Sequence, residues 1–267
     1  MSETSRREKA EAFRKMHDRS RILVLPNAWN AMSAKAIEAA GALAIATSSA
    51  GVAYSLGYAD GERAPREEIV AAIARIARVS HLPVSADIEA GFGADAAGVA
   101  RMVAEVIRAG AVGINLEDAT RDRNNPLHSI DAAVARVHAA REAANAAGVP
   151  IVINARTDVY LLGVGTPESR FEHALARLRA YRDAGGDCLF IPAIREDTLI
   201  SKFVKELNAP INILAGPGFP TVRELEQLGV ARVSVGSGPA RAAMMNARKI
   251  AEELLGSGTY SLMEGAI

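Results

Sequence analysis

The chain has 267 residues and carries 31 Lys and Arg against 31 Asp and Glu, so its formal net charge is zero. This balance gives no overall field toward nucleic acid or an anionic membrane, and we expect neither as a partner. The single cysteine, Cys188, excludes an internal disulfide, and the 49% hydrophobic content supports one large core. Without an apolar leader or a window of about 18 uninterrupted apolar residues, the sequence predicts a cytoplasmic protein.

A repeated unit organises the chain after a charged helix predicted over 5–19. A helix ending in Ala-Gly or Leu-Gly is followed at once by an apolar run, as in EAAGALAIATS, IRAGAVGINLED and EQLGVARVSVG. Glycine just past a helix end closes the last turn, and a buried parallel strand reads as a continuous apolar run. The predicted strands are 22–25, 43–47, 83–88, 112–116, 151–155, 188–192, 211–215 and 232–236. The predicted helices are 30–40, 66–80, 95–109, 130–147, 167–184, 195–207, 221–228 and 239–255.

Eight strands that are each followed by a helix predict a (β/α)8 TIM barrel, an α/β fold that often reaches this length as one domain. A doubly wound sheet is the alternative, but the first strand lacks a following G-x-G-x-x-G turn. We expect an N-terminal helix in 1–20, the barrel in 21–255 and a tail in 256–267. The last helix and the tail are expected to pack against a neighbouring subunit.

Acidic residues follow two neighbouring strands of this barrel, at the end where active sites lie. Asp87 and Glu89 alternate along the end of the third strand and therefore share a face. Glu117 and Asp118 end the fourth strand, and Arg156 ends the fifth. Taken singly, the acids also fit helix caps or solvated loops, and the arginine also fits a salt bridge inside the barrel mouth.

The residue types at the strand ends favour a hard metal ion. Several carboxylates without imidazole or thiolate select Mg²⁺ or Mn²⁺. The six lysines fall on predicted helices and the five histidines lie away from the strand ends, which disfavours a Schiff-base aldolase and a zinc hydrolase. Cys188 begins a strand and is expected to be buried. The turns at Gly216 and Gly238 leave a phosphate-binding barrel as another possibility.

Five segments carry a resemblance to a known family: PNAWNAMSAKAIEAAG, ATSSAGVAYSLGYADGE, ADIEAGFG, GINLED and NARTD. In their order and spacing, from about Leu25 to Ala243, the sequence resembles the isocitrate lyase/phosphoenolpyruvate mutase superfamily, in a branch other than the isocitrate lyases. The resemblance implies that Asp87 is the direct Mg²⁺ ligand and that the other acids act partly through water. The implied metal and substrate-carboxylate sites comprise Asp60, Asp87, Glu89 and Glu117, with Ser48, Ser49, Ala50 and Arg156.

The resemblance further implies a Mg²⁺-dependent lyase or decarboxylase that cleaves a C–C bond of a 2-oxo or 2-hydroxy di- or tricarboxylic acid. The intermediate would resemble a pyruvate enolate, with Arg156 and Asp60 in catalytic roles. A homodimer or homotetramer that exchanges its last helices is also implied.

The loop after the fourth strand, 119–128, distinguishes branches of the superfamily. It lacks the cysteine of the K-[KR]-C-G-H loop in isocitrate and methylisocitrate lyases. Asn125 matches an asparagine of phosphonomutase-like members, Arg123 replaces their lysine, and Pro192 stands where they carry a histidine. P–C bond chemistry (phosphoenolpyruvate phosphonomutase, carboxyphosphonoenolpyruvate mutase or phosphonopyruvate hydrolase) and a non-catalytic 2-oxo acid binding barrel therefore remain alternatives, with Asn125 and Arg123 as candidate catalytic residues.

Overall fold

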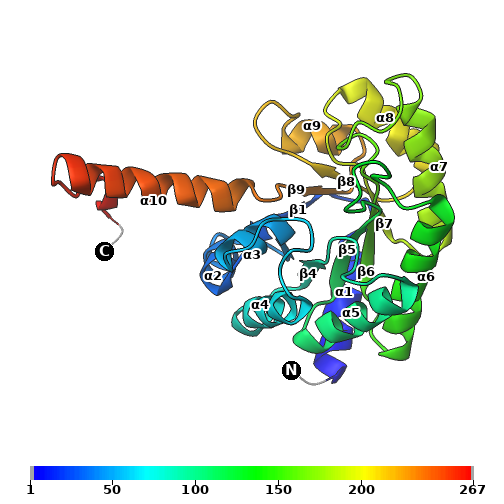
Figure 1. Cartoon of the computed structure of the whole chain (residues 1–267), viewed down its shortest axis with the longest axis horizontal. Coiled ribbons are helices and arrows are strands. Elements are labelled where there is room, and N and C mark those ends of the chain that lie inside the picture. The colour runs from blue at the N-terminus through cyan, green and yellow to red at the C-terminus, as the bar shows by residue number, and fades with distance from the viewer. Residues whose placement is uncertain (1–2, 266–267) are drawn as a thin grey trace.

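The computed structural model describes residues 3–265, so residues 1, 2, 266 and 267 of the expected terminal segments lie outside the described part. Parallel strands form one sheet in the order β1-β9-β8-β7-β6-β5-β4-β3-β2, which curls into a nearly closed barrel surrounded by helices (Figure 1). The predicted TIM-type barrel is confirmed.

The strands are β1 (Leu23–Leu25), β2 (Asn27–Ala28), β3 (Ile45–Thr47), β4 (Val84–Asp87), β5 (Gly113–Glu117), β6 (Val152–Arg156), β7 (Cys188–Phe190), β8 (Ile211–Leu214) and β9 (Arg232–Ser234). The helices are α1 (Glu3–Lys15), α2 (Ala31–Ala39), α3 (Ser49–Ser55), α4 (Arg66–Val79), α5 (Ala96–Ala109), α6 (Ile130–Ala146), α7 (Arg170–Asp183), α8 (Asp197–Leu207), α9 (Val222–Gln227) and α10 (Gly238–Gly256), with a 3-10 turn η1 (Ser261–Met263).

A change of partner at Pro26 closes the barrel. Before Pro26, β1 pairs with β9, and after it β2 pairs with β3. Proline has no N–H to donate, and its carbonyl accepts the N–H of Ala46 at 3.0 Å. The nine strand segments therefore act as eight barrel strands, of which the first contacts both of its neighbours in turn.

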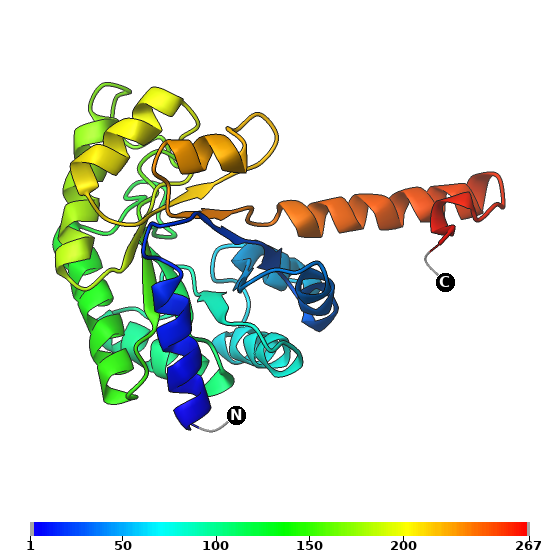
Figure 2. The same ribbon diagram turned by 180° about the vertical axis from the view of Figure 1, so that it is seen from behind.

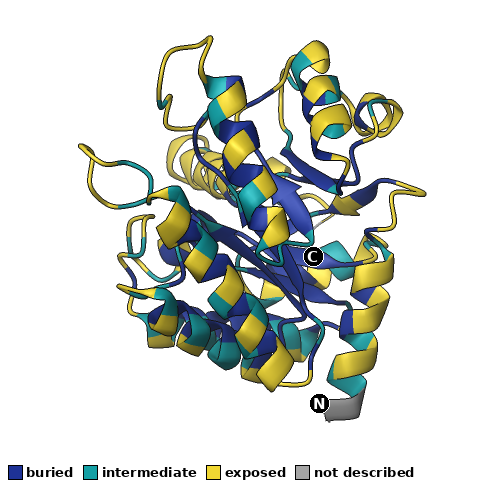
Figure 3. Ribbon diagram, turned by 90° about the vertical axis from the view of Figure 1, so that its right-hand side faces the viewer, coloured by how far each residue is buried: buried dark blue, intermediate teal, exposed yellow. Residues whose placement is uncertain are grey.

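The repeated helix–glycine–strand unit forms as the sequence predicts. Most strand residues are buried, while the helices that pack on the barrel alternate between buried and exposed residues (Figure 3). Gly110 ends α5 with a φ of 108°, and Gly229 follows α9 with a φ of 84°, conformations that glycine adopts without steric cost. These turns return the chain directly into β5 and toward β9.

Helix α1 seals one end of the barrel. The buried ring of Phe13 lies against Gly113, where an added Cβ would approach Phe13 Cε1 to 2.6 Å. His17 meets the Phe13 ring edge-on, with ring centroids 4.8 Å apart, and its Nδ1 lies 2.9 Å from the Phe13 carbonyl oxygen. Arg14 pairs with Asp187 at 2.7 Å. The predicted N-terminal helix is thus part of the barrel's packing.

Two features differ from or extend the sequence prediction. The segment after β3, expected as a loop, forms the short helix α3, because the Ser48 side chain caps it by accepting the Gly51 N–H at 3.2 Å. Helix α10 extends away from the barrel in both views (Figures 1 and 2). It exposes apolar side chains, with Met244 and Met245 each 61% exposed and Leu255 89% exposed.

In the described part of the chain, no helix is both long and apolar enough to cross a membrane.

We predict that His17 makes folding stability depend on acidic pH. Burial, followed by the positive charge of Arg232, lowers the pKa of His17 to about 4. The unfolded chain therefore binds more protons than the folded one between about pH 6.5 and pH 4, and stability falls as pH falls through that window. His17→Gln should reduce this loss between pH 7 and pH 4 by about 3 kcal/mol in urea unfolding. His81→Gln, at an exposed site, is the control. The assignment would be contradicted if the free energy of unfolding fell equally with pH in wild type and His17→Gln, or if His81→Gln reduced this fall as much as His17→Gln.

Candidate active site

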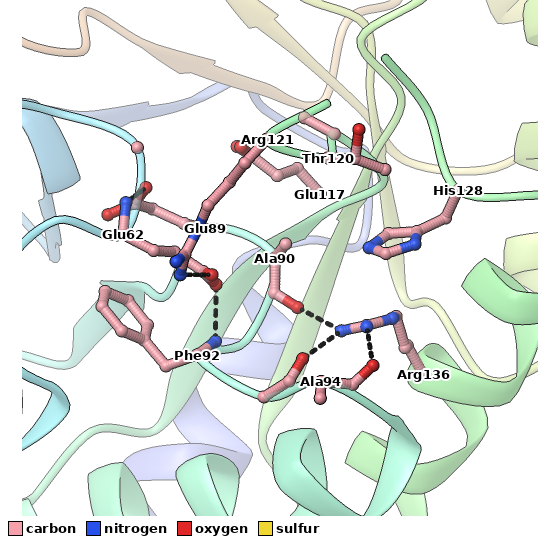
Figure 4. A pocket seen from close by; sticks show the side chains of 13 residues that line it. Glu62, Glu89, Ala90, Phe92, Ala94, Glu117, Thr120, Arg121, His128 and Arg136 are labelled. Atoms are coloured by element: carbon pink, nitrogen blue, oxygen red, sulfur yellow. Dashed lines mark hydrogen bonds and ion pairs between the residues drawn. The ribbon is translucent and has the colours of Figure 1, made fainter. Parts of the chain in front are cut away.

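A cavity of about 420 Å³ opens at the carboxyl ends of the strands and is lined by most of the predicted site. The lining includes Asp60, Asp87 and Arg156, with the predicted carboxylate pocket of Ser48, Ser49 and Ala50. Glu89 and Glu117 lie beside it and line a second cavity of about 360 Å³, which Figure 4 shows. The barrel therefore brings the acids of β4 and β5 together with the arginine of β6.

Asp87 is oriented by hydrogen bonds from two neighbouring strands and from α3. Its Oδ2 accepts the Ser49 N–H at 3.0 Å, and its Oδ1 accepts Nδ2 of Asn115 at 2.8 Å. Asn115 in turn accepts Nδ2 of Asn154 at 2.9 Å, and the Asp87 N–H donates to the Thr47 hydroxyl at 2.8 Å. Oδ1 also accepts the Glu89 N–H at 3.4 Å, whereas Oδ2 keeps a further lone pair, so Asp87 can still bind a cation from the cavity.

Arg156 is fixed by two carboxylates. Its Nη1 lies 2.8 Å from Glu117 Oε2, and its Nε and Nη2 lie 2.5 and 2.9 Å from the two oxygens of Asp158. The guanidinium also lies over the Phe190 ring, 5.6 Å from its centroid. Burial alone would lower the pKa of Arg156, but Glu117 and Asp158 raise it, so the group stays cationic. Arg156 therefore both forms a salt bridge inside the barrel mouth and lines the cavity, the two roles that the sequence left open.

If all the acids around Asp87 were ionised, they would carry more negative charge than the site neutralises. Burial first, and then the charges of Asp87 and Asp60, raise the pKa of Glu89 to about 8. Partial burial and Asp87 also raise the pKa of Asp60, which lies at the exposed rim. Burial raises the pKa of Glu117 well above its usual value, with Asp158 and Asp87 adding to the effect and Arg156 opposing it. A bound cation would relieve this repulsion.

The donor set fits Mg²⁺ bound partly through water. Among residues 3–265, no three His, Cys, Asp or Glu side chains converge closely enough to ligate one ion directly. Mg²⁺ commonly binds one or two carboxylates and keeps several waters. The predicted arrangement, with Asp87 in direct contact and Asp60, Glu89 and Glu117 acting through water, is compatible with these positions and stays a prediction.

Asp118 anchors the end of β6 to α7. One of its oxygens, Oδ2, accepts the hydroxyls of Thr157 and Tyr181 at 2.7 Å each and Nη1 of Arg177 at 3.1 Å. The other oxygen accepts the Asp158 N–H at 2.9 Å. Asp118 is only 1% exposed and its bonds fix the segment that directly follows Arg156. Helix capping, an alternative from the sequence, does not describe this residue, because Ser129 caps the following helix.

Glu62 connects three loops at the mouth of the barrel, a role that the sequence analysis missed. Its carboxylate pairs with Arg121 on the loop after β5 and accepts the Phe92 N–H, on the loop after β4, at 2.6 Å (Figure 4). Its own N–H donates to Glu89 Oε2. The only sequence signal was the last letter of the ATSSAGVAYSLGYADGE segment, where glutamate follows Asp60 and Gly61.

Arg136 supports the loop after β4 from beneath. Its guanidinium donates to three backbone carbonyls of this loop, those of Ala90 (2.9 Å), Gly93 (3.1 Å) and Ala94 (2.9 Å), as Figure 4 shows in part. Glu89 stands at the start of this loop with a φ of 49° and is 4% exposed. The strained backbone at Glu89 is therefore held by contacts from both sides.

The two candidate catalytic residues of the 119–128 loop do not line either cavity. Arg123 and Asn125 are exposed and belong to the lining of neither cavity described above. Asn125 instead donates from Nδ2 to Asp122 at 2.9 Å. Their catalytic roles stay predictions, and both would require the loop to change conformation.

Comparison with known proteins identifies what this chain is similar to. A family model described as phosphoenolpyruvate phosphomutase matches residues 13–255. The 2-methylisocitrate lyase of Salmonella typhimurium (strain LT2) is 35% identical over 206 residues, which cover 75% of this chain and 68% of the enzyme.

Solved structures share the whole fold. One, from Burkholderia cenocepacia J2315 and provisionally described as a lyase or mutase, has a TM-score of 0.92 and 38% identity, covering 99% of this chain and 94% of that one. A phosphonopyruvate hydrolase in complex with oxalate and Mg²⁺ has a TM-score of 0.86 and 27% identity, covering 97% of this chain and 91% of that one.

We predict that Asp118→Asn destabilises the protein by about 3 kcal/mol or more, because it leaves the buried Arg177 without its counter-charge. Urea unfolding at pH 7 measures the loss. The matched control is Asp122→Asn on the exposed loop, which should change the free energy of unfolding by less than about 1 kcal/mol. Equal effects of the two substitutions would show that Asp118 is not the anchor.

Proposed function

We propose that the protein is a Mg²⁺-dependent C–C lyase. The chain belongs to the phosphoenolpyruvate phosphomutase family of the isocitrate lyase/phosphoenolpyruvate mutase superfamily, and the relatives described above include lyases and mutases. Its substrate would be a 2-oxo or 2-hydroxy di- or tricarboxylic acid. The observation that carries this proposal is the crowding of Asp60, Glu89 and Glu117 around Asp87, opposite the fixed cation of Arg156.

The side chains at the mouth have distinct tasks in this proposal. Ser48, Ser49 and Ala50 would receive the substrate carboxylate at the end of β3. Arg156 would stabilise negative charge that develops on the 2-oxo oxygen, and its two ion pairs keep it in place so that little reorganisation is needed. When bound, Mg²⁺ would supply Lewis-acid stabilisation of the same oxygen.

The proton that completes cleavage needs a donor other than cysteine. Cys188, the single cysteine, is buried in β7, and burial raises its pKa to about 12. We therefore propose that the loop after β5 supplies the donor or orders a water, after Arg121 releases Glu62. This would separate the chain from relatives that use a loop cysteine.

P–C bond cleavage or transfer is the second candidate, favoured by Asn125 in the loop. Its metal and carboxylate sites would be the same, and the difference would lie in the bond broken. A non-catalytic barrel that binds 2-oxo acids would bind oxalate without turnover of any substrate.

We also propose that the protein is a homodimer or homotetramer that exchanges α10. The helix carries exposed apolar side chains at Met244, Met245, Leu254 and Leu255 and extends from the barrel without a covering partner in the described chain. The exchange would bury this apolar surface against a second subunit.

The reaction class can be tested with a panel of oxaloacetate, substituted malates, isocitrate and phosphonopyruvate, assayed for pyruvate or glyoxylate. We expect turnover of a C–C substrate that is lost with EDTA and restored by Mg²⁺. Asp87→Asn should lower kcat/KM at least about 100-fold, as loss of an electrostatic stabiliser does, while the exposed-site control Asp131→Asn should not. Turnover of phosphonopyruvate alone would favour the P–C alternative, and turnover that survives both EDTA and Asp87→Asn would contradict the metal-dependent proposal.

The proposed exchange of α10 predicts an oligomer in size-exclusion chromatography with light scattering. The double variant Met244→Glu, Leu255→Glu should shift the mass toward the monomer, because it places charges in the apolar contact. The matched control is Lys249→Glu on the same helix, which should leave the mass unchanged. A monomeric wild-type protein would contradict the proposal.

A further inference from the structure

A buried arginine without a counter-charge lies deep in the active-site cavity. Arg232 is on β9, two residues before Ser234, and its side chain lines the same cavity as Asp87 and Arg156. It is 2% exposed, and its Nε and Nη1 have no hydrogen-bond partner among residues 3–265. No contact of this side chain within the described chain neutralises its charge.

None of the groups near Arg232 forms an ion pair with it in the described chain. Burial raises the pKa of the Cys188 thiol to about 12 and lowers the pKa of His17 to about 4, so both are neutral at pH 7. Asp87 interacts with Arg232 electrostatically, but its carboxylate oxygens bond to Ser49 and Asn115 instead. Burial lowers the pKa of Arg232 to about 10, which still leaves it protonated near pH 7. An unpaired buried cation is costly, so the site favours an anionic ligand.

Two further residues that line the same cavity each have a buried polar atom without a partner in the described chain. Ser85 precedes Asp87 by two residues on β4, and Asn154 precedes Arg156 by two residues on β6. Ser85 Oγ and Asn154 Oδ1 are both buried without a partner in the described chain. We call Ser85, Asn154 and Arg232 the floor of the cavity.

The hydrogen bonds above the floor fix which atom of Asn154 faces the ligand. Asp87 is an acceptor, so Asn115 must donate Nδ2 to it and accept Nδ2 of Asn154 through Oδ1. This leaves Asn154 Oδ1 as an acceptor, while Arg232 is a donor and the Ser85 hydroxyl can donate or accept. The floor therefore offers donors to a carboxylate and one acceptor to a hydroxyl or a water beside it.

We propose that the floor binds the second carboxylate of the substrate, which makes the ligand a 2-oxo or 2-hydroxy dicarboxylate that spans the cavity from Asp87 and Arg156 to Arg232. This inference rests on the proposed function and narrows its substrate class. Asp60, Asp87, Arg156 and Arg232 all line one cavity of about 420 Å³, a volume in the range of small-molecule sites. A monocarboxylate at the mouth would leave the buried guanidinium unpaired.

The experiment compares diacids with monoacids of equal chain length. Binding is measured by thermal shift and calorimetry with MgCl₂. Oxaloacetate is compared with 2-oxobutyrate, and 2-oxoglutarate with 2-oxopentanoate. Oxalate serves as a ligand that should bind only near Asp87 and Arg156. We expect at least one diacid to bind about tenfold or more tightly than its matched monoacid, as a charge-assisted contact predicts. Arg232→Met should reduce this ratio to about twofold or less, and Arg232→Lys should keep part of it.

The melting temperature of Arg232→Met and a second variant, Ser85→Ala, provide two further tests. Without ligand, Arg232→Met should have a higher melting temperature than wild type, because it removes an uncompensated buried charge. If Arg232→Met does not fold, Ser85→Ala is used instead, and it should weaken diacid binding about threefold without changing monoacid binding.

Three results would overturn the inference. The first is equal binding of diacids and monoacids by the wild type, and the second is a diacid preference that survives Arg232→Met. The third is that acetate, added together with 2-oxobutyrate, gives the same Arg232-dependent gain in binding as a diacid. The last result would show that the floor binds a separate anion. Failure of the proposed function has a different signature, in which oxalate with Mg²⁺ does not bind while the Arg232-dependent diacid preference persists.

Discussion

Repulsion among carboxylates at one end of the barrel is the constraint on which the rest of the site depends. Asp87 and Glu89 leave β4 within three residues of each other, and Glu117 and Asp60 approach from neighbouring segments. The fold keeps them together with neutral donors: the Ser49 N–H and the Asn115 amide for Asp87, and the Glu62 N–H for Glu89. Glu89 also adopts a left-handed backbone conformation, an instance of strain located at a functional site.

The barrel interior is polar where many barrels are packed with branched apolar side chains. Asparagine amides link β6, β5 and β4 in one chain of hydrogen bonds that ends at Asp87, and Arg232 lies at the floor without a partner in the described chain. Helix α1 packs Phe13 against Gly113 at the opposite end of the barrel, and the cavity is lined by side chains from the strands and from the loops that follow them. One cavity is thus shared by Asp87, the predicted metal ligand, by Arg156 and by the floor residues.

Much of the fold follows from local patterns in the sequence. Continuous apolar runs after Ala-Gly and Leu-Gly predicted the strands, and their ends correctly grouped Asp87, Arg156 and the serines after β3. Helix α3 was missed because its small residues give no clear helical period, and the signal was the capping position of Ser48 alone. The division of the first strand at Pro26 required knowledge of both neighbours.

The contacts that the sequence did not predict share a different cause. Glu62 and Arg121 are 59 residues apart in the chain, and Asp118 and Tyr181 are 63 apart, so no window of sequence contains either pair. Arg232 did have a local signal, since it is a charged residue inside the apolar run GVARVSVG. The sequence could not reveal that the Arg232 guanidinium has no ion-pair partner in the described chain.

The most direct test of the account is a crystal structure of the protein with Mn²⁺ and oxalate, in which anomalous scattering locates the metal. The account predicts one ion in contact with Asp87, with waters between it and Asp60, Glu89 or Glu117, and oxalate between the ion and Arg156. An ion located elsewhere, or oxalate bound at the mouth without any ion at millimolar Mn²⁺, would contradict it.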